Sequence, residues 1–362
     1  MDTERRLSLI TGIAEEVVTT AELRTLLETN DKPLAYDGFE PSGIAHLPVG
    51  VYRPLLVKDL LSAGVKFNLL LADSFAWINN KMGGDLDRVR LVGKYFLEVW
   101  KAAGVDLSKV NVIWHKDYFD DGEYWKKVIL VAKHHTLART TKCLQIAGRK
   151  EGEVKEVAAL FYPSMQAADI FHMNVDICQL GMDQRKANML ARDVAEKIGF
   201  KKPVAVHHRM LLSLSGMGSA SASDEEGLKD KEIDAKMSKS KPETCIFVHD
   251  SKEDIARKIN KAFCPPKQAE GNPVLEYAKE ILFRAKPTIH IDRPAKFGGP
   301  LDYDSYAALE KDYLEDKLKA PDLKNAVSVG LDELITPIRT HFEKDKKAAE
   351  LFQQIKAYEV TR

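Results

Sequence analysis

Residues 67–73 form an apolar run, interrupted only by Asn68, that ends on the carboxylate of Asp73. Such runs are typical of strands buried on both faces, as in parallel sheets covered by helices. Further strands are predicted at 33–36, 110–114, 175–180 and 203–207, separated by helices at 46–63, 85–103 and 183–198. Strands that alternate with helices predict an α/β fold with a Rossmann-like, doubly wound parallel sheet.

Two segments depart from this alternation. Residues 117–173 carry little strand signal and are predicted to be a helical insertion between two strands, whereas residues 213–235 are small and polar and predict a mobile loop. Residues 5–28 are predicted to be one helix, and helical patterns return at 252–262, 272–282, 321–341 and 344–358. The 362 residues are therefore expected to form a Rossmann-like domain over 1–235, a linker over 236–250 and a mostly α-helical domain over 251–362.

Composition excludes several classes of protein. The 54 basic and 54 acidic residues cancel, so a nucleic-acid partner would have to bind a local basic patch. The four cysteines are widely spaced and include no Cys-x-x-Cys, so we expect no disulfide framework and no bound metal. The first residues lack an apolar signal core and no run is long enough to span a membrane, which predicts a cytoplasmic protein.

The segment Lys-Met-Ser-Lys-Ser at 236–240 is the sharpest chemical feature. Its two ammonium groups, on Lys236 and Lys239, can each attract a phosphate oxygen, and the hydroxyls of Ser238 and Ser240 can donate hydrogen bonds. A solvated polar loop is the alternative interpretation. The chain has no Gly-x-x-x-x-Gly-Lys-Ser/Thr motif, which disfavours a GTPase or an ordinary ATPase.

A second feature lies between the first predicted strand and the helix that follows it. Gly38 and Gly43 are in the turn, and His46 is in the first turn of the helix. Glycine lets a nucleotide approach the backbone, a helix N-terminus attracts anions, and His46 could donate a hydrogen bond to a phosphate. An ordinary loop with a partly buried histidine is an equally good interpretation of this feature alone.

A third feature combines a helix face with a strand end. Tyr162, Gln166, Asp169 and Met173 are spaced so that they share one face of a helix, although a half-exposed amphipathic helix would show the same spacing. Gly181 and Asp183 follow the next strand, at the edge where α/β sheets bind ligands. Gly181 allows close backbone approach, and Asp183 can accept hydrogen bonds from ribose hydroxyls.

A histidine at a helix start and a distant Lys-Met-Ser-Lys-Ser together resemble the class I aminoacyl-tRNA synthetases. The pentamer matches their second signature throughout, but His-Leu-Pro-Val at 46–49, followed by Gly50, replaces the usual His-Ile-Gly-His, so the second histidine is missing. The resemblance implies that ATP, with Mg²⁺, is a substrate and that catalysis involves His46, Gly50, Lys236 and Lys239. It implies that ATP contacts Gly38, His46, Gly50, Gly181, Asp183, Lys236, Met237, Ser238, Lys239 and Ser240.

Tyr36 and the segments 162–169 and 181–186 closely resemble the tyrosyl members of that family, of the archaeal and eukaryotic type. The resemblance implies that Tyr36 and Asp169 hold the phenol of L-tyrosine, and that the rest of the amino acid is bound by Gly38, Tyr162, Gln166 and Gln184. A buried carboxylate is satisfied by a phenol and left unpaired by phenylalanine. A tryptophanyl enzyme would share the fold and signatures but would need a partner for an indole N–H.

A nucleic-acid partner requires a basic surface, and residues 124–150 carry no acid. Their basic side chains are Lys126, Lys127, Lys133, Arg139, Lys142, Arg149 and Lys150. Such a stretch could bind phosphates through counterion release, although a solvated basic face is the alternative. The resemblance implies that the insertion contacts the acceptor end of tRNA(Tyr) and forms a homodimer. It assigns tRNA contacts to Arg139, Lys142, Arg185, Lys186, Phe297 and Asp322, the last two at the anticodon.

These observations predict a tyrosine–tRNA ligase that activates L-tyrosine with ATP and transfers it to the 3′ end of tRNA(Tyr). One alternative is a nucleotidyltransferase with the same signatures, such as a relative of the pantothenate ligases. The helical C-terminal domain and the basic insertion argue against it, since a small-molecule enzyme needs neither. The other is a non-catalytic RNA-binding paralogue, which the missing second histidine leaves open.

Overall fold

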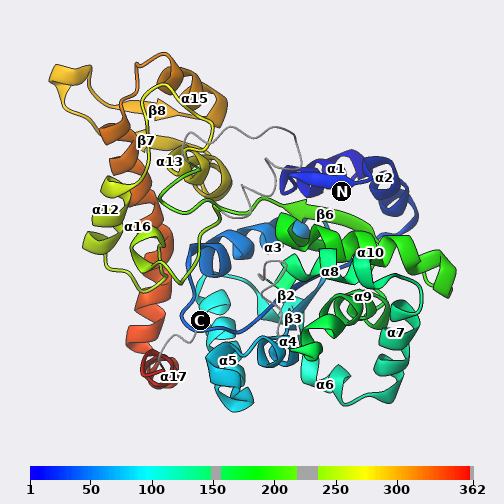
Figure 1. The fold of residues 1–362 in the computed structure, drawn as a ribbon. Coiled ribbons are helices and arrows are strands. Elements are labelled where there is room, and N and C mark those ends of the chain that lie inside the picture. Colours follow the sequence, from blue (N-terminus) through cyan, green and yellow to red (C-terminus); the bar gives the residue numbers. More distant parts are fainter. Residues whose placement is uncertain (148–155, 218–234, 359–362) are drawn as a thin grey trace.

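The computed structural model describes residues 1–147, 156–217 and 235–358. Figure 1 shows a sheet enclosed by helices, and beside it a mostly helical region that contains the long helix α16 (Ala320–Lys344). Most of the predicted loop at 213–235, together with Arg149 and Lys150, lies outside the described residues.

The sheet has six strands in the order β1-β6-β5-β2-β3-β4. The strands are β1 (Glu16–Val18), β2 (Leu34–Phe39), β3 (Lys66–Leu71), β4 (Val110–Trp114), β5 (Ile177–Gly181) and β6 (Val204–His208). Strands β2 to β6 are parallel, with Tyr36 of β2 opposite Asn68 on one side and Cys178 on the other. Every residue of β5 and β6 is buried, as expected of central strands in a covered sheet. The predicted doubly wound fold is thus confirmed.

The prediction of one helix over residues 5–28 is wrong. Two helices, α1 (Thr3–Gly12) and α2 (Thr20–Thr29), flank β1, which pairs antiparallel with β6 through Glu16 and His207. Thr19 begins α2 as its N-cap, and its side chain and that of Glu22 form a capping box. The three-residue strand is stabilised by pairing with a strand far away in sequence, so local periodicity could not reveal it.

Helices connect the strands at the predicted places. A π-helical turn (Pro48–Tyr52) and α3 (Arg53–Ser62) follow β2, α4 (Asp73–Ile78) and α5 (Leu86–Ala102) follow β3, and α10 (Arg185–Ala195) follows β5. The insertion between β4 and β5 is helical, as predicted. It contains α6 (His115–Phe119), α7 (Gly122–Ala132), α8 (Leu137–Cys143) and α9 (Tyr162–His172), with 3-10 turns at Leu144–Ala147 and Val157–Phe161.

The C-terminal region contains α12 (Lys252–Lys261), α13 (Pro273–Tyr277), α14 (Phe283–Ala285), α15 (Tyr306–Leu314), α16 and α17 (Lys346–Lys356). It also contains a hairpin of β7 (Ile289–Ile291) and β8 (Leu301–Tyr303), visible above α16 in Figure 1. The sequence did not predict this hairpin, because strands of three residues are too short to show an alternating pattern.

Helix α13 joins the helical region to the segment that follows β6. Glu276 accepts hydrogen bonds from Leu212 N and Arg209 Nε, both at 2.6 Å, and the hydroxyl of Tyr277 donates to Leu212 O at 2.5 Å. Burial raises the pKa of the Glu276 carboxyl to about 7 against the opposing charge of Arg209. Leu212 also bridges to Lys236, so the Lys-Met-Ser-Lys-Ser segment lies on this junction.

Candidate active site

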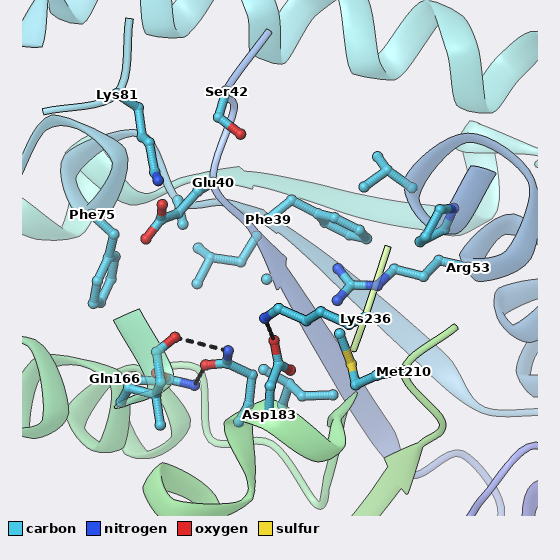
Figure 2. A pocket seen from close by; sticks show the side chains of 18 of the residues that line it. Phe39, Glu40, Ser42, Arg53, Phe75, Lys81, Gln166, Asp183, Met210 and Lys236 are labelled. Atoms are coloured by element: carbon cyan, nitrogen blue, oxygen red, sulfur yellow. Dashed lines mark hydrogen bonds and ion pairs between the residues drawn. The ribbon is translucent and has the colours of Figure 1, made fainter. Parts of the chain in front are cut away.

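A cavity of about 280 Å³ opens where β2 and β5 end, bounded by α9 and by the segment at 236–237 (Figure 2). The carboxyl edge of a parallel sheet is where α/β folds bind ligands. The residues predicted to bind substrates that line this cavity are Tyr36, Gly38, His46, Tyr162, Gln166, Asp169, Asp183, Gln184, Lys236 and Met237. Gly50, Gly181, Ser238, Lys239 and Ser240 are outside the lining.

Two buried side chains form one end of the cavity. Tyr36 and Asp169 are each 1% exposed, and the hydroxyl of Tyr36 has no hydrogen-bond partner among the described residues. His115 Nε2 lies 3.0 Å from Asp169 Oδ1 and 3.0 Å from the hydroxyl of Tyr124. With a proton on Nε2, the imidazole donates to the carboxylate of Asp169, whose other lone pairs can accept from a ligand. An acceptor and a hydroxyl at one buried end suit a ligand hydroxyl.

His115 was not predicted from the sequence. Its ring is fully buried, with the ring centroids of Phe75 and Tyr124 at 4.5 Å and 5.2 Å. It lies 54 residues from Asp169 at the start of α6, so only the fold brings the two together.

A chain of amides and carboxylates extends along α9. Gln166 Nε2 donates to Gln184 Oε1 at 3.1 Å, and Gln184 Nε2 donates to Ile146 O at 3.0 Å. The hydroxyl of Tyr162 donates to Glu40 Oε1 at 2.5 Å. Gln166 Oε1 is buried without a partner among the described residues. An unpartnered amide oxygen and a nearby carboxylate suit a ligand ammonium group.

Glu40 also was not predicted as a site residue. It accepts a second hydrogen bond from Asn79 Nδ2 at 2.6 Å and lines the cavity beside Lys81. It lies within the turn that the sequence singled out, but a lone glutamate in a loop carries no signal of its own.

The other end of the cavity is cationic. Lys236 Nζ donates to Asp183 Oδ2 at 2.8 Å, and Figure 2 shows this pair at the cavity wall. Although burial raises the pKa of the Asp183 carboxyl, the charges of Lys236 and Arg53 hold it below its ordinary value. Lys239 donates to the carbonyl and, at 2.9 Å, to the hydroxyl of Ser42. Burial, with the charge of Lys81, lowers the pKa of Lys239 to about 8.

His46 lines the cavity and is close enough to these cations to feel their charge. Burial, together with the charges of Lys239 and Arg53, holds the pKa of its imidazole well below the ordinary value. The Nδ1 of His46 is buried without a partner among the described residues. The backbone of His46 forms an isolated antiparallel β-bridge with Phe247, which follows the lysine segment. A neutral imidazole here donates a hydrogen bond but carries no charge.

Two of the three glycines predicted to contact ATP, Gly50 and Gly181, have packing roles in the structure. A Cβ at Gly50 would lie 2.3 Å from Val248 Cγ1, and one at Gly181 would lie 2.4 Å from Met210 Sδ. Gly181 therefore lets Met210 and Asp183 reach the cavity, whereas Gly50 lets Val248 pack against the π-helical turn.

The residues predicted to bind tRNA lie outside the cavity. Arg139 donates to Asp193 at 2.9 Å and Arg185 to Glu16 at 2.6 Å. Lys142 is exposed and Lys186 is half-buried, on α8 and α10 respectively. Phe297 is 59% exposed after the β7 strand, and Asp322 is in the first turn of α16.

Comparison with known proteins gives consistent matches. The family described as tRNA synthetases class I (W and Y) matches residues 28–336. A tyrosine–tRNA ligase of Aeropyrum pernix is 49% identical over 343 residues, covering 94% of this chain and 93% of the relative. The cytoplasmic tyrosine–tRNA ligase 1 of Arabidopsis thaliana is 41% identical, with 100% and 90% covered. The structure of the Pyrococcus horikoshii tyrosyl-tRNA synthetase complexed with L-tyrosine superposes with a TM-score of 0.90 at 40% identity, covering 98% and 100% of the chains.

Proposed function

This chain belongs to the class I tRNA synthetase family for tryptophan and tyrosine, and on that premise we propose that it is a tyrosine–tRNA ligase. The observation that carries the proposal is the buried pair of Tyr36 and Asp169 at the closed end of the cavity. A phenol placed there accepts a hydrogen bond from Tyr36 and donates one to Asp169. The ammonium group of the amino acid then lies along Gln166, Tyr162 and Glu40.

In the first step the tyrosine carboxylate attacks the α-phosphate of ATP in line, and pyrophosphate leaves. The chain contributes no nucleophile to this step, so its residues act by positioning the substrates and stabilising the charge that develops on the phosphates. Lys236, Lys239 and His46 donate hydrogen bonds to the phosphates. Asp183 accepts hydrogen bonds from the ribose hydroxyls. Lys236 donates to Asp183 in this structure, so it must leave Asp183 before it can bind a phosphate oxygen. A shift of the loop that carries Lys236 would allow this exchange. Mg²⁺ enters with ATP and neutralises part of the phosphate charge.

In the second step the terminal adenosine of tRNA(Tyr) attacks the carbonyl of tyrosyl-adenylate and AMP leaves. We propose residues 1–235 as the catalytic domain, 236–250 as the lysine segment and linker, and 251–362 as the anticodon-binding domain. Exposed Phe297 supports this assignment, because a base can stack on an exposed aromatic ring.

Amino-acid-dependent ATP–pyrophosphate exchange tests the function directly. We expect exchange with tyrosine and none with tryptophan or phenylalanine, measured in parallel on the full chain. Exchange with tryptophan would keep the family and overturn the pocket assignment. A folded sample that is silent with all three amino acids would favour a non-catalytic RNA-binding protein.

The anticodon assignment is tested separately by Phe297→Ala and Asp322→Ala. Loss of stacking should weaken charging of tRNA(Tyr) by roughly 10- to 100-fold, with a smaller loss for Asp322→Ala, while adenylate formation stays normal. Glu350→Ala, which removes an exposed acid on α17, serves as the control. A parallel loss of adenylate formation would show that these residues act elsewhere.

We propose that the insertion forms a homodimer. Large apolar side chains are exposed along it, namely Ile129, Leu137, Val157 and Phe161. Clustered exposed apolar groups mark protein interfaces. Ile129→Asp should shift the chain to monomer in analytical ultracentrifugation, whereas Val329→Asp, at a similarly exposed site on α16, should not. A wild-type chain that sediments as a monomer would refute the proposal.

For the compartment we propose the cytoplasm, supported by the name of the Arabidopsis relative. No helix in the described part of the chain has the length and apolar character that a membrane span requires. Cell fractionation of the tagged chain tests the assignment.

A further inference from the structure

Arg53 lines the cavity, yet the reaction as described above gives it no role. It follows the π-helical turn on the same segment as His46 and Val49, and all three line the cavity. Figure 2 shows its guanidinium group extending toward the pair of Lys236 and Asp183. It is a cation on the wall that faces the proposed nucleotide.

The protein around Arg53 leaves its donors unused. The guanidinium lies 4.4 Å from the ring centroid of Phe39, and its nearest carboxylate contact is 3.6 Å, between Nη1 and Asp37 Oδ2. That distance is too long for a hydrogen bond. No hydrogen bond joins Arg53 to another described residue, although only 14% of its side chain is exposed. A largely buried guanidinium group whose N–H donors have no acceptor among the described residues suits an anionic ligand.

The surroundings indicate which part of the nucleotide it meets. Burial lowers the pKa of His46, and the charge of Arg53 lowers it further. Burial raises the pKa of Asp183, and the charge of Arg53 helps to lower it again. Coulomb interactions weaken with distance, so the guanidinium lies near both side chains. In the proposed reaction His46 serves a phosphate and Asp183 the ribose, and the α-phosphate is the group that lies between them.

We propose that Arg53 donates hydrogen bonds to the α-phosphate of the bound nucleotide and supplies a positive charge near the position where the signature lacks its second histidine. Val49 occupies that histidine's place and cannot contact a phosphate through its side chain. The inference rests on the proposed function, because the ribose and phosphate positions come from it. Arg53 would then contact the group that is attacked, which makes it a catalytic residue.

A purely structural role for Arg53 is the rival explanation. Asp37 is 1% exposed, and burial raises the pKa of its carboxyl to about 7 despite the charge of Arg53. Arg53 could exist only to compensate this buried carboxylate. Replacing both residues by neutral amides separates the two explanations, because it removes the charge that a structural arginine would serve.

The experiment is calorimetric titration of the full chain with AMP and, separately, with adenosine. For Arg53→Gln we expect AMP to bind roughly 10- to 100-fold more weakly and adenosine to bind as it does to the wild type. Arg53→Gln combined with Asp37→Asn should show the same loss. Recovery of AMP affinity in the double variant, or equal losses for AMP and adenosine, would overturn the proposal.

Two controls keep the result interpretable. Arg90→Gln removes another arginine that faces a fully buried carboxylate, Asp73 at 3.2 Å, but lies outside the cavity lining, so its AMP affinity should be unchanged. Thermal unfolding identifies any variant that has lost its fold, and Arg53→Met, which also removes the charge but keeps much of the side chain's length, then replaces Arg53→Gln with the same expected loss. AMP binding can be measured without an amino acid. If ATP–pyrophosphate exchange with tyrosine failed, the proposed function would be refuted, but the role of Arg53 in AMP binding could still be tested.

Discussion

The two ends of the cavity are built on different principles. At the phenol end, Tyr36 and Asp169 are buried and His115 orients the carboxylate without any ligand. At the phosphate end, Lys236 is bound to Asp183 and Lys239 to Ser42, so these two ammonium groups are already engaged by the protein itself. Recognition of the amino acid therefore needs little rearrangement, whereas phosphate binding requires an exchange of partners. Selectivity and rate should respond to different substitutions.

The largest effect is expected for Lys236→Ala. Loss of one charge that stabilises the leaving pyrophosphate should slow adenylate formation by roughly 100- to 1,000-fold. The tyrosine pocket does not depend on this ammonium group, so tyrosine affinity should change little. Rapid-quench measurement of adenylate and equilibrium binding of tyrosine test the two halves, with Lys236→Arg as the control that keeps the charge. Equal losses in both would mean that the two ends are not separate.

A smaller effect, at the opposite end, is expected for Asp169→Asn. Weakening the acceptor for the phenol should reduce the ratio of kcat/KM for tyrosine over phenylalanine by roughly 10- to 100-fold. His115→Phe should lower the same ratio less, because it removes only the donor that orients Asp169, and His115→Gln, which can still donate, should restore most of it. An unchanged ratio in Asp169→Asn would refute the phenol assignment.

The smallest effect is a pH dependence confined to the phosphate end. Lys239, with its pKa lowered to about 8, is charged below that pH and neutral above it. Adenylate formation should therefore fall as pH rises through 8, at most about tenfold per pH unit, while tyrosine affinity stays flat. Lys239→Arg should remove the fall, since arginine stays charged. A wild-type profile that remains flat to pH 9.5 would show that this charge is not used.

The sequence predicted the parallel sheet because buried strands carry dense apolar runs. It did not predict β1, the β7–β8 hairpin or the helix break near Glu16, since short strands depend on distant partners. In the site, motif spacing identified some of the side chains that line the cavity, among them His46, Asp183 and Lys236.

Other site features follow only from tertiary contact. His115 gains significance from a carboxylate 54 residues away, and Arg53 from facing the cavity beyond a π-helical turn. Gly50 belongs to a signature, yet contact with Val248 is what explains it in the structure.

The junction at Leu212 limits how this chain could be recombined with its relatives. The backbone N–H and carbonyl of Leu212 are held by Glu276 and Tyr277, and Leu212 bridges to Lys236. The position of Lys236, which we propose acts on the phosphates, thus depends on both the sheet and α13. A chimaera that joined this sheet to a foreign helical region would keep the tyrosine pocket intact but would lose the support for Lys236. Successful exchange would require a boundary beyond α13 rather than at the linker.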